Sequence, residues 1–425
     1  MSRSHPVKTQ TLLSSAVMSL GLLCITAADA NATWYSTWTA APQPIWRSSI
    51  PLPTGLPATL DKQTIRQIVR VSTGGNRVRV VLSNRYGTVP LTIGAASVAL
   101  TVEGARVSPN SARALTFAGH SAVTLPPGAN WTSDPVELAV PALTRISISL
   151  YLPEPTPPAT MHWDARQTAY LAPGDRVQAT DLPYDSTFTS GLLVTDVLLE
   201  TPSPVRTIAV LGDSITDGNG ASPDAFKRWP DFFAERVAND GIAVLNAGIS
   251  GARLLEDGMG DNALARFERD VLSKPHIETA VVLLGINDIA WPGSTFAPDA
   301  PAPSFEALIA GYRQLITQAH LRNVRIVAGT LLPFEGALPD SPIHHYYSPE
   351  KERLRQQVNE WIRTSGSFDA VLDFDAWLRD PTHPTRLLAR YDSGDRLHPG
   401  DIGNQAMAER IDLQLLLGKS PRDAR

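Results

Sequence analysis

Two patterns of hydrophobic and polar positions divide the chain near residue 202. Before it, apolar residues alternate with polar ones in short runs, as where Val78, Val80 and Leu82 are interleaved with Arg77 and Arg79. A period of two residues is typical of strands with one buried face. After it, continuous apolar runs alternate with stretches of helical period, which indicates buried parallel strands joined by helices.

Residues 33–200 predict an all-β domain of the sandwich or jelly-roll kind, because turn signals separate many short strands with no helical stretch between them. Two β-branched runs, 65–71 and 77–82, flank a segment that contains Gly74 and Gly75, and this pattern predicts a hairpin. Further strands are expected at 145–152 and 192–199. Four arginines are expected on a solvated strand face: Arg66, Arg70, Arg77 and Arg79.

Residues 205–418 predict a second domain, of the α/β class, after a short linker at 201–204 that contains two prolines. Its strands are expected at 208–211, 242–246, 279–284, 324–329 and 370–374. Its helices are expected at 230–238, 304–319, 349–362 and 402–417, the last with Asp401 as its N-cap. Five repeats of strand and helix predict a mostly parallel sheet.

The first 30 residues have the pattern of a secretory signal peptide. Arg3 and Lys8 precede an apolar run at 12–26, and small residues around Ala30 offer a cleavage site. The apolar run is too short for a membrane span, so no span is expected. The sequence therefore predicts a secreted or periplasmic protein with residues 1–30 removed.

Removal of this segment would change both the cysteine content and the charge. Cys24 is the only cysteine, so the mature chain would have no disulfide. Leu23 before it is not a small residue, which disfavours a lipoprotein anchor. Loss of Arg3, Lys8 and Asp29 would shift the net charge from −5 to −6, and an acidic chain of this kind is not expected to bind nucleic acid.

The run 208–211 leads directly into Gly212, Asp213 and Ser214. The carboxyl ends of parallel strands are where ligands bind in open α/β sheets, so Ser214 is a candidate nucleophile. Gly, Asp and Ser are also ordinary turn residues. A catalytic reading therefore needs a base and oxyanion donors elsewhere in the chain.

Candidates for these partners follow other predicted strands or precede the last helix. Gly248 follows the second strand and Asn287 follows the third, and both could donate to an oxyanion together with the Ser214 N–H. His398 could act as base, with Asp395 three residues earlier as its orienting carboxylate. Asp392 is a rival for that role.

Four blocks in this order resemble the SGNH, or GDSL-type, hydrolase superfamily: GDSIT at 212–216, NAGISG at 246–251, GIND at 285–288 and DRLH at 395–398. The resemblance implies a flavodoxin-like three-layer α/β/α fold with five parallel strands. It implies Ser214, His398 and Asp395 as catalytic residues, with Ser214, Gly248 and Asn287 in the oxyanion hole. It also implies no cofactor and no metal.

The sequence thus predicts a secreted serine esterase acting on short acyl esters or on O-acetyl groups of a polysaccharide, since the β region resembles the accessory domain of secreted carbohydrate esterases such as acetylxylan esterases. A lipase or lysophospholipase is the main alternative. Two long loops, 291–303 and 333–347, carry aromatic residues that could form a lipid-binding surface. An O-acyltransferase and a carbohydrate-binding protein without catalysis are the remaining alternatives.

Overall fold

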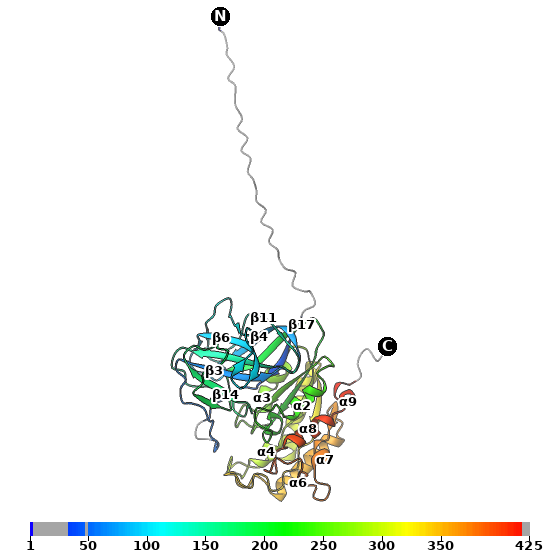
Figure 1. The fold of residues 1–425 in the computed structure, drawn as a ribbon. Coiled ribbons are helices and arrows are strands. Elements are labelled where there is room, and N and C mark those ends of the chain that lie inside the picture. Colours follow the sequence, from blue (N-terminus) through cyan, green and yellow to red (C-terminus); the bar gives the residue numbers. More distant parts are fainter. Residues whose placement is uncertain (3–32, 47–49, 419–425) are drawn as a thin grey trace.

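The computed structural model describes residues 1–2, 33–46 and 50–418 (Figure 1). The expected signal peptide, with Cys24, lies almost wholly outside the described residues. Within the described part, no helix is both long enough and apolar enough to cross a membrane.

The N-terminal region is rich in antiparallel strands, which form two larger sheets (Figure 1). The first sheet has the order β1-β17-β4-β10, with β11 also paired to β4, and the second has the order β15-β14-β3-β12-β6-β7, with β8 paired to β6. The strands of the first sheet are β1 (Thr33–Thr39), β17 (Val194–Thr201), β4 (Gly75–Ser83), β10 (Asn130–Thr132) and β11 (Val136–Val140). Those of the second are β15 (Ser186–Phe188), β14 (Ala169–Pro173), β3 (Gln63–Arg70), β12 (Arg145–Leu152), β6 (Ala95–Glu103), β7 (Arg106–Val107) and β8 (Arg113–Ala114). Smaller pairings join β2 (Gln43–Pro44), β13 (Thr160–His162) and β16 (Gly191–Leu192), and β5 (Leu91–Ile93) with β9 (Val123–Leu125).

The predicted hairpin at 65–82 is wrong, because its two strands belong to different sheets. β3 pairs with β12 and β14, whereas β4 pairs with β17, β10 and β11. The connection between them crosses from one sheet to the other, and Ser72 donates from its N and its Oγ to the Thr37 carbonyl on the way. Val80 and Ile148, one from each sheet, are fully buried in one apolar cluster. The long-range apolar contact therefore outweighs the local turn signal.

Arg66 is also misplaced by the sequence prediction, since it is buried rather than solvated. Its guanidinium donates to the Ser149 hydroxyl at 2.9 Å and to the carbonyls of Ala105 and Ala179 at 2.6 and 2.7 Å. Burial lowers its pKa to about 10. A buried guanidinium is tolerated here because several of its donors have acceptors.

The C-terminal region contains a parallel sheet of five strands in the order β19-β18-β20-β21-β22. The strands are β18 (Arg206–Gly212), β19 (Ile242–Gly248), β20 (Ile277–Leu283), β21 (Arg325–Gly329) and β22 (Ala370–Leu372). Each lies within three residues of its predicted position. An α/β region after a β-rich region is thus confirmed.

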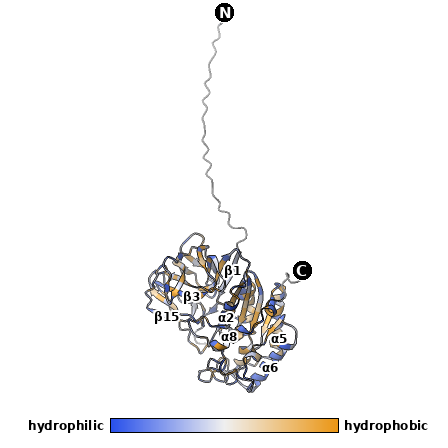
Figure 2. Ribbon diagram, turned by 45° about the vertical axis from the view of Figure 1, so that its right-hand side comes forward, coloured by the Kyte–Doolittle hydropathy of each residue, from blue (hydrophilic) through white to orange (hydrophobic). Residues whose placement is uncertain are grey.

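Helices cover both faces of this sheet, as the alternation along β18 shows. Ile208 and Val210 pack with residues of α2, α7 and α8, whereas Ala209 and Leu211 pack with residues of α3, α5 and α6. The strands are apolar and the outer surface of α6 is largely polar (Figure 2). The helices are α1 (Ser214–Asp217), α2 (Trp229–Arg236), α3 (Ala263–Phe267), the π-helical turn η1 (Glu268–Leu272), α4 (Ile286–Ala290), α5 (Phe305–Leu321), α6 (Pro349–Thr364), α7 (Phe374–Leu378), α8 (Asp401–Glu409) and α9 (Leu413–Leu417).

The end of the chain differs from the prediction of one helix at 402–417. α8 ends at Glu409, and α9 begins after Asp412, whose side chain caps it by accepting from the N–H of Gln414 at 2.8 Å. Asp401 is the first residue of α8 rather than its N-cap, which is Gly400. An Asx cap inside an apolar stretch starts a new helix, because its side chain competes for backbone donors.

The two regions are in direct contact. Tyr35 of the β region forms a small buried cluster with Val205 and Ala243 of the α/β region. Lys274 donates to the Asp196 carboxylate across the same boundary at 2.5 Å. The two regions that the short linker joins are therefore packed against each other.

Candidate active site

Three neighbouring strands of the parallel sheet end in register. Gly212 at the end of β18 is paired with Gly248 of β19 and with Leu283 of β20. The residues that follow these strands therefore meet at one edge of the sheet, where α/β folds bind ligands.

Ser214 begins α1 immediately after this strand end and is buried, with 7% of its surface exposed. Asp213 caps the helix by accepting from the N–H of Ile215 at 3.0 Å. Burial raises the pKa of Asp213 to about 7. Gly212 is required for the close approach, because a Cβ there would lie 2.3 Å from the Thr216 hydroxyl.

A buried arginine ties the ends of β18 and β19 together from α3. Arg266 donates to the Gly212 carbonyl at 2.9 Å and to the Ala247 carbonyl at 2.7 Å. Its charge is paired with Asp270, 3.3 Å away. The positions of both strand ends are thereby fixed by one side chain that the sequence prediction did not single out.

The structure brings Ser214, His398 and Asp395 together in one chain of hydrogen bonds, although the serine and the histidine are 184 positions apart in the sequence. The Ser214 Oγ lies 2.8 Å from His398 Nε2, and His398 Nδ1 lies 2.6 Å from Asp395 Oδ2. A carboxylate at Nδ1 keeps the proton on that nitrogen, so Nε2 is left to accept from the serine hydroxyl.

Asp395, rather than its rival Asp392, faces the histidine. Its second oxygen accepts from the backbone N–H groups of Leu397 and His398 at 2.9 and 2.8 Å. Burial raises the pKa of Asp395, but the hydrogen bonds and charge of His398 outweigh it and hold the pKa well below its usual value. Asp392 instead accepts from the N–H groups of Gly394 and Arg396 and shapes the loop.

Asn287 lies in α4 beyond the end of β20, with its amide orientation fixed by its neighbours. Its Oδ1 accepts from Tyr346 Oη at 2.6 Å and from Trp291 Nε1 at 3.1 Å. Its Nδ2 donates one hydrogen to the Ala252 carbonyl at 3.0 Å. Since an amide nitrogen carries two hydrogens, one remains for an acceptor in the site.

Gly248 does not offer the donor that the sequence predicts. It is the last residue of β19, and its N–H donates to the Asn246 side chain at 2.9 Å. Three residues later, Gly251 has a φ of +75° and donates its N–H to no acceptor among the described residues. The Ser214 N–H has no acceptor among them either. Gly251 therefore replaces Gly248 as the candidate donor, and the signal for it was the second glycine of the same NAGISG block.

Residues 210–406 match the family model described as the GDSL-like lipase/acylhydrolase family. The chain carries a GDSL-like lipase/acylhydrolase domain. The family acts on ester substrates, and the chain is accordingly a carboxylic ester hydrolase. The match covers the whole parallel sheet except the start of β18, and it includes every predicted site residue.

Several solved structures are similar to the GDSL-like domain. A lipolytic protein of the G-D-S-L family from Desulfitobacterium hafniense is 19% identical, with 48% of this chain and 95% of that chain covered and a TM-score of 0.35. A GDSL-like lipase from Bacteroides thetaiotaomicron is 18% identical (49% and 87% covered, TM-score 0.37). An acetylxylan esterase from Geobacillus stearothermophilus is 20% identical (51% and 96% covered, TM-score 0.36). No curated protein matches the chain.

The two long loops of the GDSL-like domain both contact Asn287, through Trp291 and Tyr346, and they are joined to each other. The Thr295 N–H donates to the His344 carbonyl at 3.1 Å, and the Thr295 hydroxyl accepts from the His344 N–H at 2.8 Å. Trp291 stacks on Phe296 with ring centroids 4.4 Å apart. Within residues 33–46 and 50–418, no group of three His, Cys, Asp or Glu residues is placed to hold a metal.

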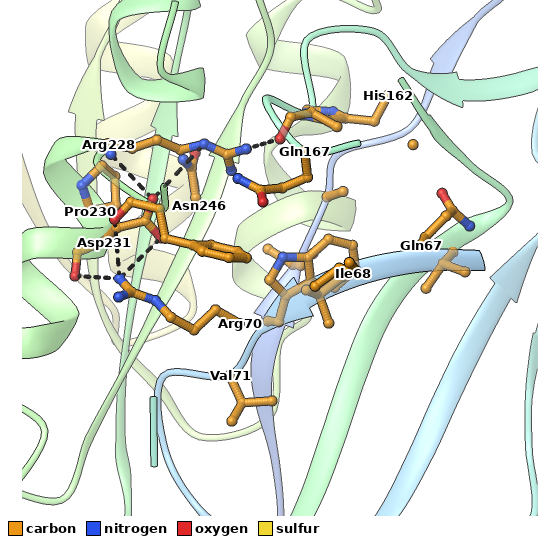
Figure 3. A pocket seen from close by; sticks show the side chains of 18 of the residues that line it. Gln67, Ile68, Arg70, Val71, His162, Gln167, Arg228, Pro230, Asp231 and Asn246 are labelled. Carbon is orange, nitrogen blue, oxygen red and sulfur yellow. Dashed lines mark hydrogen bonds and ion pairs between the residues drawn. The ribbon is translucent and has the colours of Figure 1, made fainter. Parts of the chain in front are cut away.

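A cavity of about 60 Å³ lies between the β region and the GDSL-like domain (Figure 3). Gln67 and Arg70 line it from β3, Arg228 and Pro230 from the start of α2, and Asn246 from β19. None of Ser214, Asp395 and His398 is among its lining residues. It is therefore a feature of the contact between the regions and not the place where an ester reaches the serine.

Proposed function

We propose that this chain is a serine esterase that hydrolyses short acyl esters through an acyl-enzyme. The observation that carries the proposal is the hydrogen-bonded chain from Ser214 Oγ through His398 to Asp395, with distances of 2.8 and 2.6 Å. A serine hydroxyl is a weak nucleophile at neutral pH, and a hydrogen-bonded imidazole is the base that activates it.

In the first half of the proposed reaction, Ser214 Oγ attacks the ester carbonyl while His398 Nε2 takes the serine proton. The ionised Asp395 stabilises the imidazolium that forms. When the tetrahedral intermediate collapses, His398 returns the proton to the departing alcohol. A water molecule then repeats the sequence on the acyl-enzyme, with His398 again as base, and releases the acid.

The oxyanion of each tetrahedral intermediate is proposed to accept from the N–H groups of Ser214 and Gly251 and from Asn287 Nδ2. The two N–H groups have no acceptor in the part of the chain that the structure describes, and Asn287 Nδ2 has one hydrogen beyond the one that it donates to Ala252. Loss of a single such donor typically costs about 2.7–4 kcal/mol of barrier. The proposal thus keeps Ser214 and Asn287 from the sequence prediction and exchanges Gly248 for Gly251.

The burial of the aromatic residues near the site favours short acyl groups over the lipase alternative. Trp291, Phe334 and Tyr346 are 3%, 0% and 3% exposed, so they form part of the core. A lipase needs a broad apolar surface open to its substrate. Short esters, such as O-acetyl groups on a polysaccharide, require only a small acyl site.

The finer features of the sequence prediction belong to the same proposal. The strand order, with the second strand at the edge beside the first, supports a flavodoxin-like arrangement. The two antiparallel sheets around one apolar cluster support a β-sandwich-like N-terminal domain. The pattern of residues 1–30 supports secretion or a periplasmic location.

The test uses the purified mature protein with p-nitrophenyl esters from acetyl to palmitoyl, and with acetylated xylan. We expect turnover to be fastest with acetyl or butyryl esters. Ser214→Ala should lower kcat by about 10³-fold or more, because the nucleophile is lost. Turnover that survives in Ser214→Ala would refute the nucleophile, and a maximum at long chains would favour the lipase. Acetate release from xylan would support the polysaccharide substrate.

A further inference from the structure

A histidine of the β region reaches the α/β region close to the nucleophile. His162, at the end of β13, is buried, and its Nε2 lies 2.9 Å from Asp217 Oδ1. Its Nδ1 lies 3.0 Å from the Ala41 carbonyl. Asp217 is the last residue of α1, the short helix that begins with Ser214.

Asp217 also contacts the loop that contains Gly251, the proposed oxyanion donor. Its other oxygen, Oδ2, accepts from the Ser250 N–H at 2.8 Å and from the Ser250 hydroxyl at 2.9 Å. Ser250 is the residue immediately before Gly251. Both oxygens of one buried carboxylate are thus used to join β13 to the loop after β19.

The hydrogen bonds of His162 fit a charged pair. The Ala41 carbonyl can only accept, and an ionised Asp217 can only accept as well, so a ring with a proton on each nitrogen satisfies both contacts. Burial lowers the pKa of His162, but the Asp217 carboxylate outweighs it and raises the pKa above its usual value. The Asp217 pKa is correspondingly lowered by His162 against the effect of burial. A buried pair of this kind is held in one geometry, because either partner alone is costly.

A second side chain of the β region holds the same loop from its far end. Gln43 of β2 is fully buried and donates to the Met259 carbonyl at 2.8 Å. The Met259 side chain fills the space beside Gly251, where an added Cβ would lie 2.5 Å from the sulfur. Gly251 is therefore flanked by two segments, each of which is anchored to the β region.

We propose that His162 is a positioning residue for ester hydrolysis: through Asp217 and Ser250 it fixes the Gly251 N–H in the orientation that an oxyanion requires. The inference rests on the proposed function for its catalytic consequence. It gives the β region a part in the reaction itself, since the catalytic domain alone lacks the side chain that completes this chain of hydrogen bonds.

The test compares His162→Ala with the wild-type full chain by steady-state kinetics on p-nitrophenyl acetate and by hydrogen–deuterium exchange of the peptide covering residues 247–256. We expect kcat to fall by about 10- to 100-fold with little change in KM, because a donor displaced by a fraction of an ångström mainly weakens transition-state binding. Exchange in the 247–256 peptide should become faster. His162→Gln, whose amide can still donate to Asp217, should recover much of kcat.

Asp196→Asn is the matched control, because it weakens the buried Asp196–Lys274 pair between the same two regions without touching the Gly251 loop. Its kcat and its exchange in 247–256 should stay close to wild type. An equal loss of kcat in Asp196→Asn would overturn the proposal, since general loosening would then explain it. Unchanged exchange in His162→Ala would overturn it as well.

Two further outcomes remain decisive. If His162→Ala does not fold, Ser250→Ala removes the hydroxyl bond to Asp217 and keeps the Ser250 N–H bond, while the contacts between the two regions stay in place. It should lower kcat by about 3- to 10-fold. An unchanged kcat there would refute the chain of contacts. If the wild type hydrolyses no ester, the proposed function fails, while the exchange comparison of His162→Ala with Asp196→Asn still decides the positioning role.

Discussion

At the scale of single residues, the site depends on side chains that orient other side chains. Asn287 shows this most directly, because its oxygen accepts from both Tyr346 and Trp291, and only its nitrogen can face a substrate. Burial and the nearby Asp213 and Asp395 charges raise the pKa of Tyr346 well above its usual value, so its hydroxyl stays protonated and donates. Tyr346 comes from the 333–347 loop, which the sequence prediction considered only as a possible substrate surface.

Tyr346→Phe removes one of the two donors that fix Asn287. We expect kcat on p-nitrophenyl acetate to fall by about 10-fold, because the amide can rotate away from the oxyanion, with a loss of about 1 kcal/mol or less in stability. Tyr347→Phe is the control, since the Tyr347 hydroxyl makes no hydrogen bond within residues 33–46 and 50–418. Similar losses of kcat in the two variants would argue against an orienting role.

At the scale of elements, the ends of β18 and β19 lead into Ser214 and Gly251, and α3 holds both strand ends through Arg266. The helix was not predicted, because five residues are too few to give a helical period. Its N-cap, Asn262, accepts from the Ala265 N–H at 3.0 Å and starts the helix where Arg266 can reach both carbonyls. The five-residue helix α3 thus fixes the ends of both β18 and β19.

Arg266→Leu should destabilise the protein by about 1–3 kcal/mol, because the buried carbonyls of Gly212 and Ala247 lose donors. Asp270 keeps its two contacts with Arg269, at 2.7 and 3.0 Å, and so is not left unpaired. Urea denaturation of the variant and the wild type measures the difference. Arg322→Leu, which removes an exposed pair with Glu268, serves as control and should change stability by less than about 1 kcal/mol. Equal stability of Arg266→Leu and wild type would show that the strand ends do not depend on this contact.

At the scale of the whole molecule, the β region and the α/β region share buried polar and apolar contacts. Val244 of β19, the edge strand of the parallel sheet, donates its N–H to the Ser72 hydroxyl of the β region at 3.2 Å. The buried cluster of Tyr35, Val205 and Ala243 lies beside this contact. Contacts of this kind couple the stabilities of the two regions, because separating the regions would leave buried polar groups without hydrogen-bond partners.

Thermal unfolding should therefore follow a single calorimetric transition for the two regions. Asp196→Asn weakens one buried contact between them and should lower the midpoint by a few degrees without splitting the transition, since a loss of about 1 kcal/mol corresponds to about 2–4 °C in domains of this size. Differential scanning calorimetry of both proteins gives the measurement. Two resolved transitions in the wild type would show that the regions unfold independently.

The sequence by itself determined the features that depend on local pattern. The apolar runs placed all five parallel strands, because buried strands need continuous apolar residues whatever surrounds them. The motif blocks predicted Ser214 and Asn287 after strand ends and Asp395 and His398 before the last helix, because these residue types at element boundaries can be recognised without knowing their neighbours in space. The spacing of three residues was also enough to prefer Asp395 over Asp392.

Only the tertiary structure decided which groups meet. The sequence alone does not distinguish Gly248 from Gly251 as a donor. In the structure Gly248 ends β19 and donates its N–H to Asn246, whereas Gly251 has a φ of +75° and its N–H has no acceptor among the described residues. The false hairpin at 65–82 and the buried Arg66 have the same origin, since the partners in both cases come from segments that are distant in the sequence. The contact between His162 and Asp217 joins residues 55 positions apart across two regions. Hydrogen bonds and burial depend on proximity in space, and no local pattern along the chain encodes it.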